Sequence, residues 1–308
     1  MKSVCTLSVA VLACMSLCVY AQRSQENSDW LVENLGLTIN TEYSERFSMI
    51  SADGLVLYFA SDRPDGQGEL NDQGRKAWDI YVAWRVSVDE PFAEPVNLGP
   101  TVNSPYGDHS AAFSEDGHWM YFASERPGGC GGYDLYISYR EDTKDHLGWG
   151  PAEHLGCTVN TRFDEACPFF ITDQQTGKPL LYLARETVLT QGPNFDIYIS
   201  EVGSDMRELG SASLVSELSS PSHDGHFEPR HGFLWSARVG GYGGSDVWLT
   251  ESPRRNQWSQ AKNMGPAINT EYAETLPSGT TDGKLFFPSN RPGGYGDFDI
   301  YVGTPSDP

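Results

Sequence analysis

The chain has 308 residues and a formal net charge of −21, from 42 acidic and 21 basic residues. Because so acidic a surface repels phosphate backbones, nucleic acid is excluded as an expected partner. A hydrophobic content of 39% argues against disorder, and the 32 glycines and 12% aromatic residues are typical of short strands joined by tight turns.

The first 21 residues have the pattern of an export signal. Lys2 supplies a positive charge, residues 4–20 carry none, and Ala21 ends a tolerated cleavage pattern. We therefore expect cleavage near Ala21 and a mature chain, residues 22–308, that is periplasmic or secreted. Two alternatives stay open: a transmembrane anchor made from the same run, and a lipoprotein processed at Cys14. No later segment approaches the roughly 20 apolar residues of a membrane span, so no transmembrane segment is expected in the mature chain.

One repeat recurs five times along the chain. Four copies open with an asparagine followed by a short polar segment with an aromatic residue, and the fourth copy is a worn version of it. The copies begin at Asn40, Asn103, Asn160, Ser219 and Asn269. The spacing between them is that of a four-stranded propeller blade with its loops.

Each copy carries signals for four strands. A turn pair such as Asp53-Gly54 precedes an aromatic-rich run such as Leu57–Phe59, and a polar, glycine-containing loop follows. The fourth strand runs from an aromatic residue to a glycine, as in Phe92–Gly99. The third strand always opens with an aspartate, which we interpret as a cap for loop amides. These aspartates are Asp79, Asp134, Asp196, Asp246 and Asp299.

The two ends of the chain complete one blade. The last copy stops at Gly303 with three strands, and residues 30–36 supply a fourth-strand pattern before the first copy. Pairing the two ends would remove two exposed sheet edges. We therefore predict an all-β fold: a single five-bladed β-propeller with four-stranded antiparallel blades, the last closed by the N-terminal strand. An open array of repeats is the alternative. The predicted blades are 40–99, 103–156, 160–215, 219–265, and 269–303 plus 30–36.

The repeat resembles a known family. The segments Asp116-Gly117, Tyr121–Gly129 and Asp134–Ile137 are similar to the TolB-type, WD40-like β-propeller repeat of bacterial periplasmic and cell-envelope proteins. The resemblance covers nearly all of the mature chain and implies the propeller fold. Relatives include scaffolds, binding modules and a few carbohydrate-active enzymes. Because the extra domains of TolB and of similar envelope proteins have no counterpart in the sequence, a direct role in the Tol system is not expected.

An acidic residue always stands five positions into the repeat. Since equivalent positions in a propeller share one height and radius, these side chains are predicted to ring one mouth of the channel and to bind calcium or a polar ligand. The alternative is structural, because four arginines that follow the second strand would pair with them. The third copy has Thr187 at that arginine position and Arg185 two residues earlier. The acids are Glu45, Asp108, Glu165, Asp224 and Glu274, and the arginines, also candidate ligand-binding residues, are Arg63, Arg126, Arg238 and Arg291.

The worn copy concentrates histidines. Ser222–His231 contains three of them, and one hypothesis is a metal or acid–base site formed by His223 with His226, or by His109 with Asp108. The alternative is an eroded repeat with solvated histidines, because the spacing matches no helical zinc motif. Trp78, Trp84 and Trp119 do not belong to the tryptophans that recur at one repeat position, so they are candidate surfaces for stacking on a sugar.

Cys130, Cys157 and Cys167 remain after the export signal, and a Cys157–Cys167 bridge is one possible pairing. No motif of a serine or cysteine nucleophile is present in the sequence. The favoured function is therefore a monomeric, exported binding and interaction module that holds a protein or a glycan at its funnel or one face. The alternative is a carbohydrate-active hydrolase or lyase whose acid and base come from the five carboxylates, His109, His223 or His226. Calcium is the one cofactor that the sequence suggests.

Overall fold

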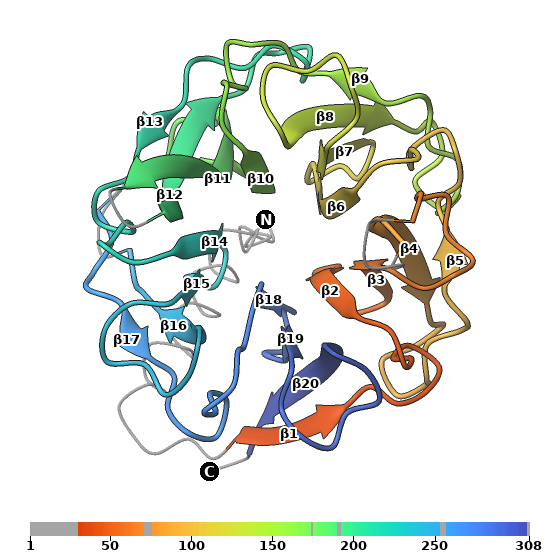
Figure 1. Ribbon diagram of the computed structural model, residues 1–308, viewed down its shortest axis with the longest axis vertical. Helices are drawn as coiled ribbons and strands as arrows, with labels where there is room; N and C mark the ends of the chain where they lie inside the picture. Colours follow the sequence, from red (N-terminus) through yellow and green to blue (C-terminus); the bar gives the residue numbers. More distant parts are fainter. Residues whose placement is uncertain (1–29, 71–75, 174, 190–191, 253–256, 307–308) are drawn as a thin grey trace, which may run out of the picture.

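The computed structural model describes residues 30–70, 76–173, 175–189, 192–252 and 257–306. Five antiparallel four-stranded sheets stand around one axis (Figure 1), which confirms the closed five-bladed propeller. The described residues contain no helix, and therefore none that is long and apolar enough to cross a membrane. The predicted export signal lies outside the described residues.

The strands of each blade are numbered along the chain and lie in order from the axis outward, except in the last blade. Blade 1 contains β2 (Glu45–Ile50), β3 (Val56–Ser61), β4 (Asp79–Trp84) and β5 (Val96–Asn97). Blade 2 contains β6 (Asp108–Phe113), β7 (Trp119–Ser124), β8 (Asp134–Tyr139) and β9 (Glu153–His154). Blade 3 contains β10 (Glu165–Thr172), β11 (Pro179–Leu189), β12 (Gly192–Glu201) and β13 (Ser213–Leu214). Blade 4 contains β14 (Asp224–Glu228), β15 (Phe233–Ser236), β16 (Asp246–Leu249) and β17 (Lys262–Asn263). Blade 5 contains β18 (Ser278–Gly279), β19 (Leu285–Ser289), β20 (Asp299–Pro305) and β1 (Trp30–Asn34).

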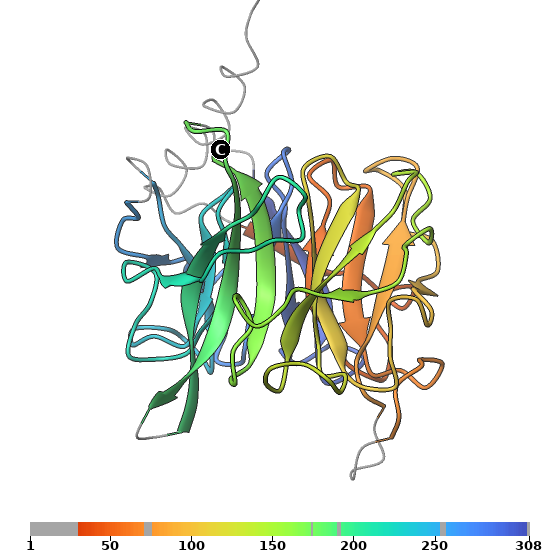
Figure 2. The same ribbon diagram turned by 90° about the horizontal axis from the view of Figure 1, so that it is seen from above.

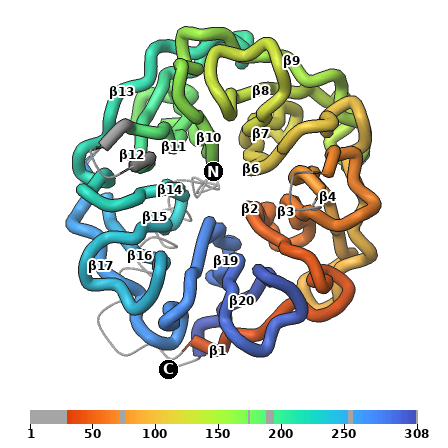
Figure 3. The backbone as a smooth tube through the Cα atoms, viewed as in Figure 1, coloured from red at the N-terminus to blue at the C-terminus, as the bar shows by residue number. Residues whose placement is uncertain are grey.

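The closing blade joins the two ends of the described chain. Strand β1 pairs antiparallel with β20, from Trp30 opposite Pro305 to Asn34 opposite Tyr301. The side-chain amide of Asn34 also donates a hydrogen bond of 2.7 Å to the Asp299 carboxylate. The tube view follows the chain once around the ring and back to β1 (Figure 3). The edge of β20 is therefore covered, as the repeat count predicts.

Apolar layers lie between neighbouring blades. Val82 of blade 1 packs with Met120 and Phe122 of blade 2, and Phe59 of blade 1 packs with Phe286 of blade 5. All five side chains are at most 1% exposed. Each blade thus buries its aromatic-rich strand against the next blade, which explains the nearly continuous apolar runs in the second and third strands.

The asparagine that opens the repeat connects successive blades. The Asn103 side chain accepts a hydrogen bond of 2.9 Å from the Ile80 amide and donates one of 3.0 Å to the Ile80 carbonyl. Asn40, Asn160 and Asn269 make the same pair of bonds to the preceding blade. In the worn copy Ser219 accepts a bond of 3.1 Å from the Ile197 amide instead.

The strand-opening aspartates cap loops, as the sequence predicts. Asp246 accepts from the Tyr242 amide at 2.6 Å, and Asp299 accepts from the Tyr295 amide at 2.7 Å. In blade 2 the partner of the aspartate is unusual, because His154 Nε2 lies 3.2 Å from Asp134 at the position where blades 1, 4 and 5 place an asparagine.

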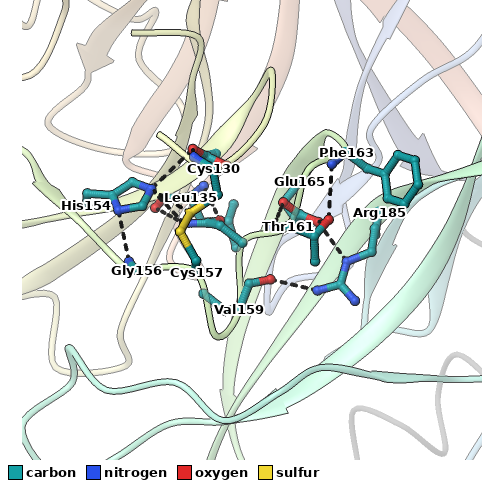
Figure 4. The surroundings of a disulfide bond; sticks show 12 residues. Cys130, Leu135, His154, Gly156, Cys157, Val159, Thr161, Phe163, Glu165 and Arg185 are labelled. Atoms are coloured by element: carbon teal, nitrogen blue, oxygen red, sulfur yellow. Dashed lines mark hydrogen bonds and ion pairs between the residues drawn. A yellow bond between two sulfur atoms is a disulfide. The ribbon is translucent and has the colours of Figure 1, made fainter. Parts of the chain in front are cut away.

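The disulfide joins Cys130 to Cys157, whose Cα atoms are 5.8 Å apart (Figure 4), and Cys167 is a buried free thiol. The suggested Cys157–Cys167 bridge is therefore wrong. The physical reason is radial position: Cys167 lies on the innermost strand β10, whereas Cys157 follows the outermost strand β9 and meets the glycine-rich loop that precedes β8.

Candidate functional site

The five repeated carboxylates lie where the inner strands begin, and all are 0% exposed. Each forms an ion pair with an arginine of its own blade. The pairs are Glu45–Arg63 at 3.0 Å, Asp108–Arg126 at 2.7 Å, Glu165–Arg185 at 2.7 Å, Asp224–Arg238 at 2.6 Å and Glu274–Arg291 at 3.1 Å.

Glu45 shows what these carboxylates do. It accepts hydrogen bonds from the Thr41 amide at 2.8 Å, the Thr41 hydroxyl at 2.7 Å and the Ser61 hydroxyl at 3.0 Å. Arg63 completes the set and also donates to the Ile39 carbonyl at 2.9 Å. The carboxylate thus ties the turn before the inner strand to the end of the second strand, which is the structural alternative raised by the sequence. Calcium binding by these acids stays a prediction.

In blade 3 the arginine of the ion pair stands at a different position of the repeat. Arg185 lies directly opposite Glu165 on β11, at the position where blades 1 and 2 place Ser61 and Ser124. Its Nη2 still reaches the Val159 carbonyl, at 2.7 Å. Burial raises the pKa of Glu165, while hydrogen bonds from Thr161 and the charge of Arg185 oppose that effect.

A second group of residues surrounds the axis at the same end of the ring. In three inner strands the pairing register shifts just after the acid, and the residues there have positive φ: Phe47 at 54°, Ser110 at 60° and Cys167 at 50°. Such bulges turn side chains away from the regular sheet direction. The inner strands therefore present non-repeating side chains close to the axis.

Aromatic contacts link these side chains in two groups, one between blades 1 and 2 and one between blades 3 and 4. Phe47 stacks on His109 with ring centroids 4.1 Å apart, and its other neighbour is Trp78 at 5.8 Å. His109 also contacts Tyr133 at 4.5 Å, and Phe195 contacts His223 at 5.3 Å. With Arg46 these residues form what we call the axial cluster: Arg46, Phe47, Trp78, His109, Tyr133, Phe195 and His223. All but His109 are partly exposed.

Most of the axial cluster escapes the sequence prediction, which includes only Trp78, His109 and His223 among the candidates. One sequence signal was available: an aromatic residue stands immediately before the strand-opening aspartate in four of five copies. These residues are Trp78, Tyr133, Phe195 and Phe298. The carbonyls of Trp78 and Tyr133 accept hydrogen bonds of 2.7 Å from the backbone amides of Asp108 and Glu165 in the next blade, which places these aromatic residues beside the inner strands.

The electrostatics of the axial cluster favour neutral histidines beside a cation. Burial and the charge of Arg46 lower the pKa of His109 to about 3. Burial also lowers the pKa of His223, although Asp224 opposes this effect. Burial and Glu125 raise the pKa of Tyr133, so its hydroxyl stays protonated. At neutral pH the cluster thus holds uncharged imidazoles and a protonated phenol beside the Arg46 guanidinium.

The histidines of the sequence hypothesis lie in different surroundings, and a metal or acid–base site formed by them stays a prediction. Asp108 bonds Arg126, whereas His109 Nδ1 lies 2.7 Å from the Ser110 hydroxyl. His226 is buried against Phe169, and burial lowers its pKa to about 4. In the described part of the chain, the one group with metal-ligand spacing is Cys130, Asp134 and His154, and its sulfur is in the disulfide (Figure 4).

Two further features lie apart from the axial cluster. Trp119 begins β7, at the opposite end of blade 2 from Asp108, and Arg207 covers its ring at 4.5 Å. A pocket of about 400 Å³ lies between residues 37–43 and 63–65 of blade 1. Arg63 lines this pocket while held by Glu45.

A scan against protein-family models and a search of curated proteins both find no match. Solved structures do match. They include the α-L-arabinofuranosidase PaAbf62A of Podospora anserina, solved with cellotriose, at 12% identity and TM-score 0.55 over 91% of this chain and 98% of that chain. Arabinanase Arb43A of Bacillus subtilis matches at 12% identity and TM-score 0.54, over 88% and 96%. Zg3597, a family 117 glycoside hydrolase of Zobellia galactanivorans, matches at 15% identity and TM-score 0.53, over 90% of each chain. At these identities the likeness shows a shared fold.

These findings correct two sequence interpretations. Membership of the TolB-type family is not supported, although the propeller is. The favoured function, a binding and interaction module, is overturned because the structural neighbours across the whole ring are glycoside hydrolases.

Proposed function

We propose that this protein is a carbohydrate-active enzyme that binds a glycan at the axial cluster and cleaves a glycosidic bond there. The observation that carries the proposal is the cluster itself, in which partly exposed aromatic rings from several blades surround neutral histidines. The neighbours add support, because one was solved with cellotriose and another, a family 62 hydrolase, with xylotriose.

The cluster supplies the two components that glycan cleavage needs. Phe47, Trp78 and Phe195 offer ring faces and edges on which the apolar faces of sugars stack. His223 is the proposed general base, because its imidazole is neutral and partly exposed. Tyr133 is the proposed general acid, because its hydroxyl is protonated at neutral pH and its ring contacts His109 within the cluster.

The five repeated carboxylates are not assigned a catalytic role. A carboxylate pair for glycoside hydrolysis must face the sugar from two sides, and these five instead face arginines inside their own blades. Export remains part of the proposal, since a glycan substrate outside the cytoplasm fits the predicted signal. A disulfide between Cys130 and Cys157 also suits an oxidising compartment.

The test is a screen of the purified protein on neutral and acidic polysaccharides, scored for new reducing ends and for new carbon–carbon double bonds. We expect product from at least one polymer, with H223Q and Y133F each lowering kcat by about 100-fold or more. H118Q is the matched control, because His118 precedes β7 at the far end of blade 2. Full activity of both H223Q and Y133F, or no product from any polymer, would reject the proposal.

A further inference from the structure

We propose that the substrate is an acidic glycan and that Arg46 binds the carboxylate of one of its uronic acid units. The inference rests on the function proposed above and adds the chemical class of the substrate. It is argued from the position of Arg46, from its unsatisfied Nε donor, and from the contrast with the other arginines at this end of the ring.

Arg46 lies on the inner strand β2, directly after the buried Glu45. Its guanidinium carbon is 4.2 Å from the ring centroid of Phe298 in blade 5 and 5.4 Å from that of Phe47. Its charge also lowers the pKa of His109 in blade 2 and of His223 in blade 4. One guanidinium thus acts on groups from four blades, which places it near the axis among the aromatic rings.

The guanidinium of Arg46 has an unsatisfied donor. Its Nε–H is buried and has no hydrogen-bond partner among the residues that the structure describes. A buried donor without a partner is costly, more so on a charged group, and a ligand removes that cost. Burial lowers the pKa of Arg46, with Asp297 opposing the effect, yet arginine stays charged in proteins.

The neighbouring arginines differ from Arg46, because each of them forms an ion pair with the repeated acid of its own blade. Arg63, for example, donates Nε to the Ser61 hydroxyl at 3.2 Å and Nη2 to Glu45 at 3.0 Å. Arg126, Arg185, Arg238 and Arg291 are held in the same manner by their own acids. Arg46 has no equivalent in the other copies, which carry His109, Ala166, Gly225 and Thr275 at its position.

The shape of the Arg46 guanidinium favours a carboxylate as its ligand. A guanidinium presents parallel N–H donors in one plane, which match the two oxygens of a carboxylate. The aromatic rings beside it suit the pyranose ring that carries this carboxylate. Because the protein has a net charge of −21, general attraction of polyanions is excluded, and recognition of an acidic sugar must come from a local cation such as Arg46.

The experiment compares acidic and neutral trisaccharides by calorimetry: trigalacturonate, triglucuronate and trimannuronate against galactotriose, cellotriose and mannotriose. We expect at least one uronate to bind more tightly than its neutral counterpart. R46Q should lower that affinity by about 10- to 100-fold and R46K by less, with neutral ligands unaffected. R207Q is the matched control, because Arg207 is half exposed and pairs with Glu153. Thermal unfolding verifies that each variant is folded.

The outcomes separate this inference from the proposed function. Cleavage of a neutral glycan that R46Q leaves unchanged, with no uronate bound, rejects the inference and keeps the enzyme. Uronate binding that depends on Arg46 without cleavage of any glycan keeps the subsite and rejects the enzyme. Arg46-dependent binding of a sulfated neutral trisaccharide, with no uronate bound, overturns the carboxylate assignment.

Discussion

Arginines play two different roles at the end of the ring where the inner strands begin, and their partners distinguish the roles. Five of them neutralise fully buried acids, and removing one member of such a pair would leave an uncompensated buried charge. Arg46 instead stands among aromatic rings with an unsatisfied donor. Residue type alone cannot tell these roles apart, because both require a positively charged, largely buried side chain.

Glu228 controls a part of the pH dependence of stability. It is fully buried at the end of β14 and accepts bonds of 2.7 Å from Arg230 Nε and from the His231 amide. Burial alone would raise the pKa of Glu228, but His231 and Arg230 outweigh burial and hold it at about 2. Because an unfolded glutamate titrates near pH ~4.3, the stabilisation is present above that pH and is lost as pH falls towards 2.

We therefore expect E228Q to lose on the order of 3 kcal/mol of unfolding free energy at pH 6, and the difference from the native protein to shrink at pH 3. Urea unfolding at the two pH values measures both quantities. E217Q is the control, since Glu217 is exposed. A difference between E228Q and the native protein that does not change with pH would contradict the assignment.

How far the sequence predicts a residue depends on whether its position repeats. The acids, their arginines and the strand-opening aspartates recur in register. The sequence therefore predicts their positions and offers ion pairs between the acids and the arginines as one of two interpretations. Arg46 and Phe47 could not be found in this way. Positions that face the axis differ from blade to blade, because each is shaped by the other four inner strands and not by its own blade.

At the scale of strands, blade 3 departs most from the repeat. Its β11–β12 hairpin pairs without interruption from Leu180 opposite Glu201 to Leu189 opposite Gly192. Figure 2 shows this hairpin extending past the neighbouring blades. The sequence predicts a polar loop after the second strand, and in blade 3 the strands continue instead. Local signals do not fix this choice, since Thr187 and Val188 suit a strand but the repeat favours a loop.

The disulfide holds two loops that other blades leave unlinked. Its removal should destabilise the protein by about 3.5 kcal/mol, because it closes a loop with a sequence separation of 27. We expect the double variant C130S/C157S to melt at a lower temperature, and the native protein with dithiothreitol to melt at the same lowered temperature.

C167S is the control for this experiment. Burial raises the pKa of the Cys167 thiol to about 12, so this thiol stays protonated and should not react with alkylating reagents in the folded protein. A melting temperature of the native protein that dithiothreitol leaves unchanged would show that the bridge contributes nothing to stability.

At the scale of the whole molecule, closure of the ring depends on five residues. Strand β1 alternates in burial, with Trp30 and Val32 turned to the apolar cluster that contains Leu285 and Phe287, and Leu31 exposed. The sequence predicts this contact because the last copy lacks a strand and the pattern of the missing strand stands at the other end. The number of strands in each repeat can be read from the sequence even where individual residues differ between copies. The identity of the side chains near the axis cannot be read in this way.

A chain that begins at Leu35 should therefore be less stable by about 5 kcal/mol, since it loses the burial of two apolar side chains and uncovers the edge of β20. Guanidinium unfolding measures the loss. A synthetic peptide of residues 28–38 should restore stability in proportion to the logarithm of its concentration, because it binds the folded ring and not the unfolded chain. A chain that begins at Gln22 is the control and should unfold as the full chain does. If the chain from Leu35 unfolds at the same denaturant concentration as this control, closure by β1 does not stabilise the ring.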